Sequence, residues 1–310
     1  MVIYTCTMNP AIDLFIETER MDAAKVNRTI ANEIQANGKG VNVSLVMKKM
    51  GLSSTALGFT GGFTGRYIRD YLTEQGVGNN FVEVAGLTRI NVFTKVNTSN
   101  QEFKLVNQGP TVSREAQDEL LRQIWEMSEN DYIVVSGSLP KGVDPEILTE
   151  LAKISKERGI KAVFDVSHPA VLDTLSYHPY LLKPNDEELA EWFGLTGLTR
   201  EHSLLYGRRL IHLGAKNVLL SLGAKGAIYI AENLSAWFCS APKGAVVNTA
   251  GAGDTLLGSF LTGLVSGQDT KDNLARSVAA GSSTAFRSGL TDFSDVEELK
   301  KHIQVQKMEV

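Results

Sequence analysis

The stretch that says most about the fold of this chain is Asn248-Thr249-Ala250-Gly251-Ala252-Gly253-Asp254, which runs directly into a helical pattern from Thr255 to Val265. Its small residues permit close backbone approach, and a helix N-terminus presents unpaired N–H groups to an anion. The stretch therefore predicts a phosphate cradle. Asp254 should stay ionised beside the positive helix terminus and is suited to take a proton from an attacking hydroxyl. The alternative is a helix-capping aspartate after a flexible loop.

Two familiar nucleotide-binding loops are absent from the sequence. No GxxxxGK[ST] occurs, and Gly251 and Gly253 lack the third glycine of GxGxxG. Neither a P-loop nor a standard dinucleotide fingerprint is therefore present, and nucleotide binding must use another architecture.

A second glycine turn, Asn37-Gly38-Lys39-Gly40-Val41-Asn42-Val43-Ser44, leads into a helical pattern that runs through Met50. Lys39 and Asn42 in such a turn suit an anionic or hydroxylated ligand. The alternative is a tight connection that carries a solvated lysine.

Strand and helix patterns alternate through most of the chain. Three segments carry apolar residues at helical spacing, with Ser113 and Asp144 as N-caps: 113–127, 144–157 and 186–193. Short β-rich runs are predicted to be strands at 2–7, 55–59, 132–135, 162–166, 180–182 and 218–222. Such alternation predicts a mostly parallel sheet covered by helices on both faces, with ligands beyond the carboxyl ends of its strands.

Two segments break the alternation. They are residues 11–36 and 89–106, and in the second a polar tip at 97–101 separates two β-rich runs like a hairpin. We interpret both as strands of a small β appendage. No linker, repeat or low-complexity tract sets it apart, so the prediction is one domain over 1–310 with inserted strands.

Composition excludes several classes of protein. The 310 residues are 43% hydrophobic and 21% charged, with a formal net charge of −4 and no long charge run, which disfavours nucleic acid as a partner. No export signal and no run of eighteen apolar residues occurs, so membrane insertion is not expected. Cys6 and Cys239 are predicted to be buried free thiols, and His168 and His178 lack metal-ligand spacing. These features predict a cytoplasmic protein.

Taken together, seven motifs strongly resemble the ribokinase-like sugar kinases, in particular their phosphofructokinase-B branch. They follow the family order over nearly the whole chain: TMNPAID at the start, NGKGVNVS, TRINV from Thr88, SGSLPKG from Ser136, KPNDEE from Lys183, SLGAKGA from Ser221 and NTAGAGDT from Asn248. The resemblance implies a three-layer α/β sandwich with a small β-sheet lid. Asn37 stands where many relatives have Gly, and Asn248 stands where ribokinases commonly have Asp.

The resemblance also implies roles for individual residues. Asp254 would be the base that deprotonates the acceptor hydroxyl, and the backbone amides of Gly251, Ala252 and Gly253 would hold the transferring phosphoryl group. Glu188 would organise Mg²⁺, through bound water. The residues that match nucleotide-binding motifs are Lys183, Asn185, Ser221, Gly223, Lys225 and Gly226.

On the substrate side, Asp13 matches a ligand of sugar hydroxyls, and four cations are expected to converge on a phosphate that the acceptor already carries. The substrate-binding set is Asp13, Arg28, Gly38, Lys39, Asn42, Arg89, Lys104 and Ser138. A homodimer through the lid is expected, because exposed sheet edges and apolar faces invite covering.

The leading hypothesis is an ATP-dependent kinase that phosphorylates fructose 1-phosphate to fructose 1,6-bisphosphate. Tagatose 6-phosphate and fructose 6-phosphate are the alternative acceptors. A different class of function, a non-catalytic sugar-phosphate sensor, would keep the fold and the pocket without turnover.

Overall fold

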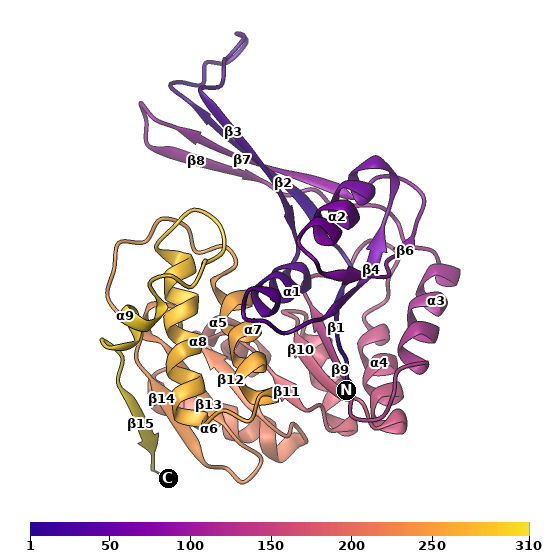
Figure 1. The fold of residues 1–310 in the computed structure, drawn as a ribbon, viewed down its shortest axis with the longest axis vertical. Helices are drawn as coiled ribbons and strands as arrows, with labels where there is room; N and C mark the ends of the chain where they lie inside the picture. Colours follow the sequence, from indigo (N-terminus) through magenta and orange to yellow (C-terminus); the bar gives the residue numbers. More distant parts are fainter. Residues whose placement is uncertain (310) are drawn as a thin grey trace.

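The computed structural model describes residues 1–309 (Figure 1). Its strands are β1 Ile3–Thr7, β2 Ala11–Thr18, β3 Ala31–Asn37, β4 Thr55–Thr60, β5 Gly78–Asn79, β6 Val82–Glu83, β7 Arg89–Val96, β8 Gln101–Leu105, β9 Tyr132–Ser136, β10 Lys161–Asp165, β11 Leu181–Leu182, β12 Val218–Ser221, β13 Ala227–Ile230, β14 Ala236–Cys239 and β15 Val305–Met308. Its helices are α1 Lys39–Lys49, α2 Gly62–Glu74, α3 Arg114–Trp125, α4 Glu146–Arg158, α5 Asp186–Trp192, α6 Arg200–Leu213, α7 Ala252–Val265, α8 Thr270–Ala285 and α9 Val296–Lys300, with 3₁₀ turns η1 Pro169–Tyr177 and η2 Gly223–Lys225.

The large sheet is parallel over most of its width. Its strands lie in the order β15-β14-β13-β12-β11-β10-β9-β1-β4-β5, and every pair from β12 to β5 is parallel. Each of the predicted strand runs forms one of these strands, because short β-branched and aromatic runs suit a sheet buried on both faces. The predicted α/β fold with a mostly parallel sheet is confirmed.

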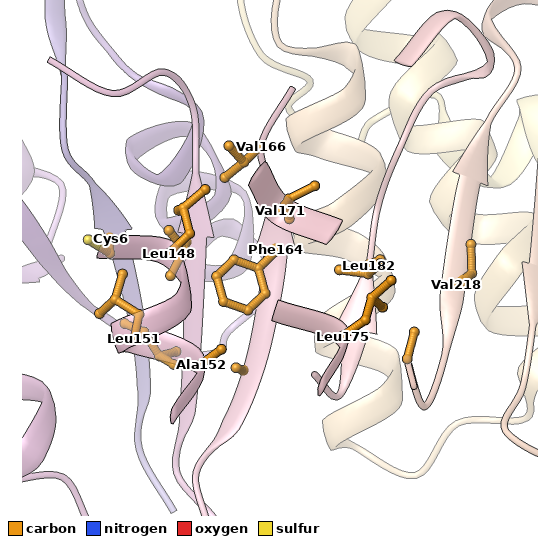
Figure 2. Close-up of a cluster of buried hydrophobic side chains, with 14 of the residues drawn as sticks. Cys6, Leu148, Leu151, Ala152, Phe164, Val166, Val171, Leu175, Leu182 and Val218 are labelled. Atoms are coloured by element: carbon orange, nitrogen blue, oxygen red, sulfur yellow. The ribbon is translucent and has the colours of Figure 1, made fainter. Parts of the chain in front are cut away.

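Helices cover both faces of this sheet and make it three-layered. On one face α3, α4, η1, α5 and α6 pack on a continuous apolar core, in which Phe164 of β10 lies among Leu148 and Leu151 of α4 and Leu175 of η1 (Figure 2). On the other face α1, α7 and α8 pack on Val134, Val163 and their neighbours. Successive residues of one strand therefore serve different cores, as the two-residue side-chain period of a strand requires.

Four strands form a second, single-layered sheet, which we call the lid. Its order is β3-β2-β7-β8, drawn from the two segments that interrupt the alternation, and it projects from the large domain (Figure 1). At its base, Ile12, Ala36 and Ile90 pack against α2. Most of the rest of β3 and β8 is exposed.

The sequence patterns did not predict everything. The strands β13, β14 and β15 add an antiparallel edge to the sheet, with the last strand supplied by residues 305–308. Helix α7 begins at Ala252, so Asp254 lies in its first turn rather than before the helix.

Candidate active site

The functional motifs meet at the carboxyl edge of the parallel strands. Helix α1 starts just after the lid strand β3, Asp165 ends β10, Lys183 follows β11, and Asp254 lies on α7. Asp254 is 6% exposed, and its Oδ2 accepts a hydrogen bond from Asn42 Nδ2 at 2.8 Å. The N-cap of α7 is Gly251, which makes no side-chain capping bond, so the capping alternative for Asp254 does not hold.

Asp165 forms ion pairs with two lysines in a buried cluster of charged side chains. Its Oδ1 lies 3.1 Å from Lys39 Nζ and 3.1 Å from Lys183 Nζ, and its carboxylate is fully buried. The second oxygen, Oδ2, has no partner within residues 1–309. Asp165 therefore holds two ammonium groups beside Asp254 and keeps one free acceptor.

Burial and charge set the ionisation of this cluster. Burial, together with the charge of Asp165, raises the pKa of Asp254 to about 6, against the hydrogen bond from Asn42 and the charges of Lys39 and Lys183. For Asp165, burial alone would raise the pKa, but Lys183 and Lys39 outweigh it and lower that pKa. Burial would likewise lower the pKa of Lys39, and the charges of Asp165, Asp254 and Glu188 raise it instead. Asp254 is thus a carboxylate whose pKa suits proton transfer near neutral pH.

The glycine stretch forms a tight entry to α7. Gly251 has a φ of 78°, which glycine adopts without strain, and a Cβ there would also meet Leu290 at 2.8 Å. Asn248 Oδ1 accepts from the backbone N–H of Ala250 at 3.0 Å, which shapes the loop. Of the three amides predicted to bind a phosphoryl group, that of Ala252 already donates to Thr249 O at 3.3 Å. Gly251 and Gly253 remain the stronger candidates at this helix N-terminus.

On the acceptor side, Asp13 of β2 lies in a network of amides. It accepts from Asn37 Nδ2 at one oxygen and from Asn91 Nδ2 at the other, at 2.8 Å in the second case. Burial raises the pKa of Asp13, while these two bonds and the nearby Arg89 oppose the rise. Gly38 comes directly after Asn37 and has a φ of 149°. A Cβ at this position would lie 2.7 Å from the Thr7 side chain, so this turn needs a glycine.

The four predicted cations have different surroundings. Arg89 is partly buried and donates to the backbone oxygens of Asn9 at 2.8 Å and Asn107 at 3.1 Å. Lys39 instead forms an ion pair with Asp165. Lys104 is exposed on β8, and Arg28 lies in the loop between β2 and β3 at the far end of the lid (Figure 1). The expected convergence of all four on one pocket is therefore not found within this chain.

A cavity of about 490 Å³ separates the lid from the loop that precedes α7. Phe15, Phe93 and Lys104 line it on the lid side, and Val247 and Asn248 line it opposite. The two phenylalanine rings are stacked with centroids 5.0 Å apart. Asp254 is not among the residues that line this cavity.

The nucleotide motifs are brought together beside this edge. Asn185 caps α5, with its Oδ1 accepting from Glu188 N at 2.7 Å while Glu188 Oε2 accepts from Asn185 N at 2.9 Å. Ser221 forms an isolated parallel bridge with Asn185. Lys225, in the turn η2 that starts at Gly223 and ends before Gly226, lies 3.8 Å from Asp186. Lys183 Nζ lies close to Gly253: a Cβ added to this glycine would be 3.5 Å from the Lys183 ammonium nitrogen.

Several residues of the site were not singled out from the sequence. Asp165 looked like the end of an apolar strand, and the only signal was an acid at the carboxyl end of a buried run. Asn9 donates to Ser138 Oγ at 3.3 Å, and its own buried Oδ1 has no partner within residues 1–309. Asn91 lies in the TRINV motif, but the sequence did not predict its hydrogen bond to Asp13.

The described residues contain no cluster of three or more His, Cys, Asp or Glu suited to hold a metal. Across residues 1–309, no helix combines the length and the apolar character needed to cross a membrane. Cys6 and Cys239 are buried free thiols, as predicted.

Comparison with known proteins matches the chain to one family. The model of the pfkB family of carbohydrate kinases matches residues 4–297. The chain belongs to the PfkB family. A D-tagatose-1-phosphate kinase of Bacillus licheniformis is 44% identical, over 98% of this chain and 99% of the relative. A 1-phosphofructokinase of Bacillus subtilis is 35% identical, over 99% of this chain and 100% of the relative.

Solved structures agree with the family assignment. Phosphofructokinase-2 from Escherichia coli in complex with substrates and products is similar with a TM-score of 0.90 at 27% identity, covering 97% of this chain and 99% of that one. This PfkB protein is accordingly a sugar-phosphate kinase, and ATP is its expected phosphoryl donor.

Proposed function

We propose that this PfkB kinase transfers the γ-phosphoryl group of ATP to the 6-hydroxyl of a ketohexose 1-phosphate, with fructose 1-phosphate as the expected acceptor. The observation that carries the proposal is Arg89. Its partly buried guanidinium is held by two backbone oxygens, and no carboxylate forms an ion pair with it within residues 1–309. Such a cation suits a phosphate that the acceptor already carries.

Asp254 then acts on the hydroxyl at the other end of the acceptor. In phosphoryl transfer, positioning and electrostatic stabilisation supply most of the catalysis, and a carboxylate orients the nucleophile and accepts its proton. The family resemblance implies that Asp13 binds acceptor hydroxyls, and its carboxylate lies near Arg89 at the lid base. We assign the stabilisation of the charge on the transferring group to the amides of Gly251 and Gly253 and to the ammonium groups of Lys39 and Lys183, which lie close to Asp254.

The residues present also fit Mg²⁺. Asp165 Oδ2 is a buried carboxylate oxygen without a partner in the described chain, and Glu188 keeps one oxygen outside its capping box. Mg²⁺ is usually bound by one or two carboxylates and by substrate phosphates, with several waters retained. We propose that Asp165 and Glu188 hold it, where it would neutralise charge on the nucleotide phosphates.

The acceptor is tested by measuring ADP release with four sugar phosphates: fructose 1-phosphate, tagatose 1-phosphate, tagatose 6-phosphate and fructose 6-phosphate. We expect the highest kcat/KM with a ketohexose 1-phosphate. Tagatose 1-phosphate is the second candidate, because the relative that is 44% identical is named for that sugar. A preference for either 6-phosphate would overturn the proposal.

Replacing Arg89 with Ala is expected to raise the acceptor KM about 10- to 100-fold, because charge-assisted hydrogen bonds to the phosphate are lost. Lys39→Ala provides the contrast. Its ammonium lies on Asp165 beside Asp254, so we expect turnover to fall by about 10²-fold with a smaller change in acceptor KM. Steady-state kinetics in both substrates checks these expectations. Arg69→Ala is the control, because Arg69 of α2 forms its ion pair with Glu83 of β6 and has no role in the proposed site. Loss of ATP binding in both variants would mean that the acceptor and nucleotide sides are reversed.

We further propose that the lid closes on the acceptor, narrowing the cavity that separates it from the loop before α7. Closure would exclude water, which competes with the sugar hydroxyl for the phosphoryl group. Backbone hydrogen exchange should slow in residues 11–36 and 89–106 with sugar phosphate, and more than with ATP alone. Equal protection by both ligands would contradict the closing lid.

The outer face of the lid supports the expected homodimer. Leu14, Ile34, Val92 and Leu105 pair in one row across the four strands and point away from Asp13, because side chains alternate along a strand. Ile34 is 52% exposed and Leu105 is 62% exposed. We propose that two copies cover this face mutually.

Sedimentation velocity tests the dimer. The wild-type chain should sediment as a dimer at micromolar concentration, and the double variant Ile34→Glu, Leu105→Glu as a folded monomer. A wild-type monomer at all concentrations would contradict the proposal.

A further inference from the structure

A continuous line of side-chain amides joins the two carboxylates of the site. Asn37 Nδ2 donates to Asp13 Oδ2, and Asn37 Oδ1 accepts from Asn42 Nδ2 at 2.9 Å. The same Asn42 Nδ2 donates its other proton to Asp254 Oδ2 at 2.8 Å. Asp13 on the lid and Asp254 on α7 are therefore connected through only two side chains.

The orientation of the Asn37 amide follows from fixed groups around it. The backbone N–H of Gly38 can only donate, and it lies 2.6 Å from Asn37 Oδ1. An ionised Asp13 can only accept, so it requires the NH₂ of Asn37 on its side. If the Asn37 amide were flipped, its NH₂ would face the N–H of Gly38 and its oxygen would face the carboxylate of Asp13, and neither hydrogen bond could form. Asn37 must then accept from Asn42, which leaves Asn42 to donate to Asp254.

Asn37, through which the two carboxylates are bridged, lies at the boundary between the lid and the large domain. It is the last residue of the lid strand β3, and Gly38, the N-cap of α1, comes next. The bridge therefore crosses the joint at which the lid becomes the large domain.

We propose that Asn37 is a positioning residue that fixes Asp13 relative to Asp254, through Asn42, so that the acceptor held at the lid presents its hydroxyl to the base. The inference rests on the proposed roles of Asp13 and Asp254. The charged groups that face Asp254 are Asp165 from β10, Lys39 from α1 and Lys183 after β11, and Arg89 faces Asp13. None of these makes a hydrogen bond to both carboxylates within residues 1–309, so the amide line is the direct connection.

The test is steady-state kinetics of Asn37→Gly in both substrates. Because Asn37 contacts Asp13 directly and Asp254 through Asn42, we expect a higher acceptor KM together with a lower kcat. The combined loss in acceptor kcat/KM should be about 10- to 100-fold, as for hydrogen bonds to charged groups. The KM for ATP should stay within about twofold, since the nucleotide motifs do not contact Asn37. The control is Asn80→Gly, an exposed asparagine in the turn between β5 and β6, which should match the wild type.

A double variant separates positioning from a general structural role. In an Asn42→Ala background the contact with Asp254 is already gone, so Asn37→Gly should lower kcat by less than about twofold while still raising the acceptor KM. Multiplication of the two kcat losses would overturn the proposal, as would an unchanged acceptor KM in Asn37→Gly. If Asn37→Gly does not fold, Asn37→Ala carries the same expectations, because β3 is extended there.

Failure of this inference can be told apart from failure of the proposed function. The kinetics use whichever of the four sugar phosphates the wild-type chain phosphorylates best. A preference for a 6-phosphate would overturn the proposed acceptor and leave the Asn37 test intact. Wild-type kinetics in Asn37→Gly would overturn only the positioning role.

Discussion

Asp254→Asn is expected to lower turnover by at least ~10²-fold, with little change in the KM for ATP. Asparagine keeps the shape of the side chain, but it cannot accept the proton of the acceptor hydroxyl. It also sets an amide against the amide of Asn42, which now donates to Asp254 at 2.8 Å. Initial rates of ADP formation, with Asp70→Asn on the exposed face of α2 as control, measure the effect.

The pH profile of the wild-type enzyme gives a second check on Asp254. Burial and the charge of Asp165 raise the pKa of Asp254 to about 6, and only the carboxylate can act as a base. Turnover should therefore be full above that pH and should fall as the pH drops through about 6. A correctly folded Asp254→Asn variant with near-normal turnover would remove Asp254 from the mechanism.

Asp165→Asn is expected to lower both stability and turnover. Lys183 is 5% exposed, and without the carboxylate its buried ammonium loses its ion-pair partner. Breaking a buried pair in this way typically costs about 3–5 kcal/mol of unfolding free energy. Turnover should fall by about 10²-fold, because Lys39 and Lys183 lose the group that positions them.

Urea unfolding and initial rates measure these two effects, with Asp173→Asn on the exposed side of η1 as the matched control. A loss of less than about 1 kcal/mol, which is in the range for an exposed ion pair, would mean that the cluster is solvated in solution.

The sequence predicted those parts of the site that depend on local geometry. The glycine stretch with Asp254 indicated a helix N-terminus, and the helical pattern over 186–193 predicted α5, whose capping box of Asn185 and Glu188 was recognised only in the structure. The two lid segments were recognisable because they break the alternation of strand and helix. The parallel sheet followed from the strand runs, because each run is short, apolar and separated from the next by a helix.

The sequence could not show which distant groups meet. Lys39 and Asp165 are 126 positions apart, and only the adjacency of β10 to the start of α1 brings them together. The four cations were grouped by resemblance, yet Lys39 begins a core helix while Arg89 begins a lid strand. The polar strand β15 was missed because its partner β14 is 66 residues away at its closest, so no local pattern marks it.

The single-layered construction of the lid has an evolutionary consequence. Under the proposed function, acceptor recognition depends on β2, β3 and β7, whereas phosphoryl transfer depends on the carboxyl edge of the large sheet. Beyond its base the lid contributes little to the buried core, so substitutions on the side of the lid that lines the cavity should cost little stability and can change how an acceptor is held. A lineage can therefore acquire a new acceptor by drift in the lid and keep its catalytic chemistry unchanged. Asn37 is the exception, because a substitution there would disturb both the lid carboxylate Asp13 and, through Asn42, the base Asp254.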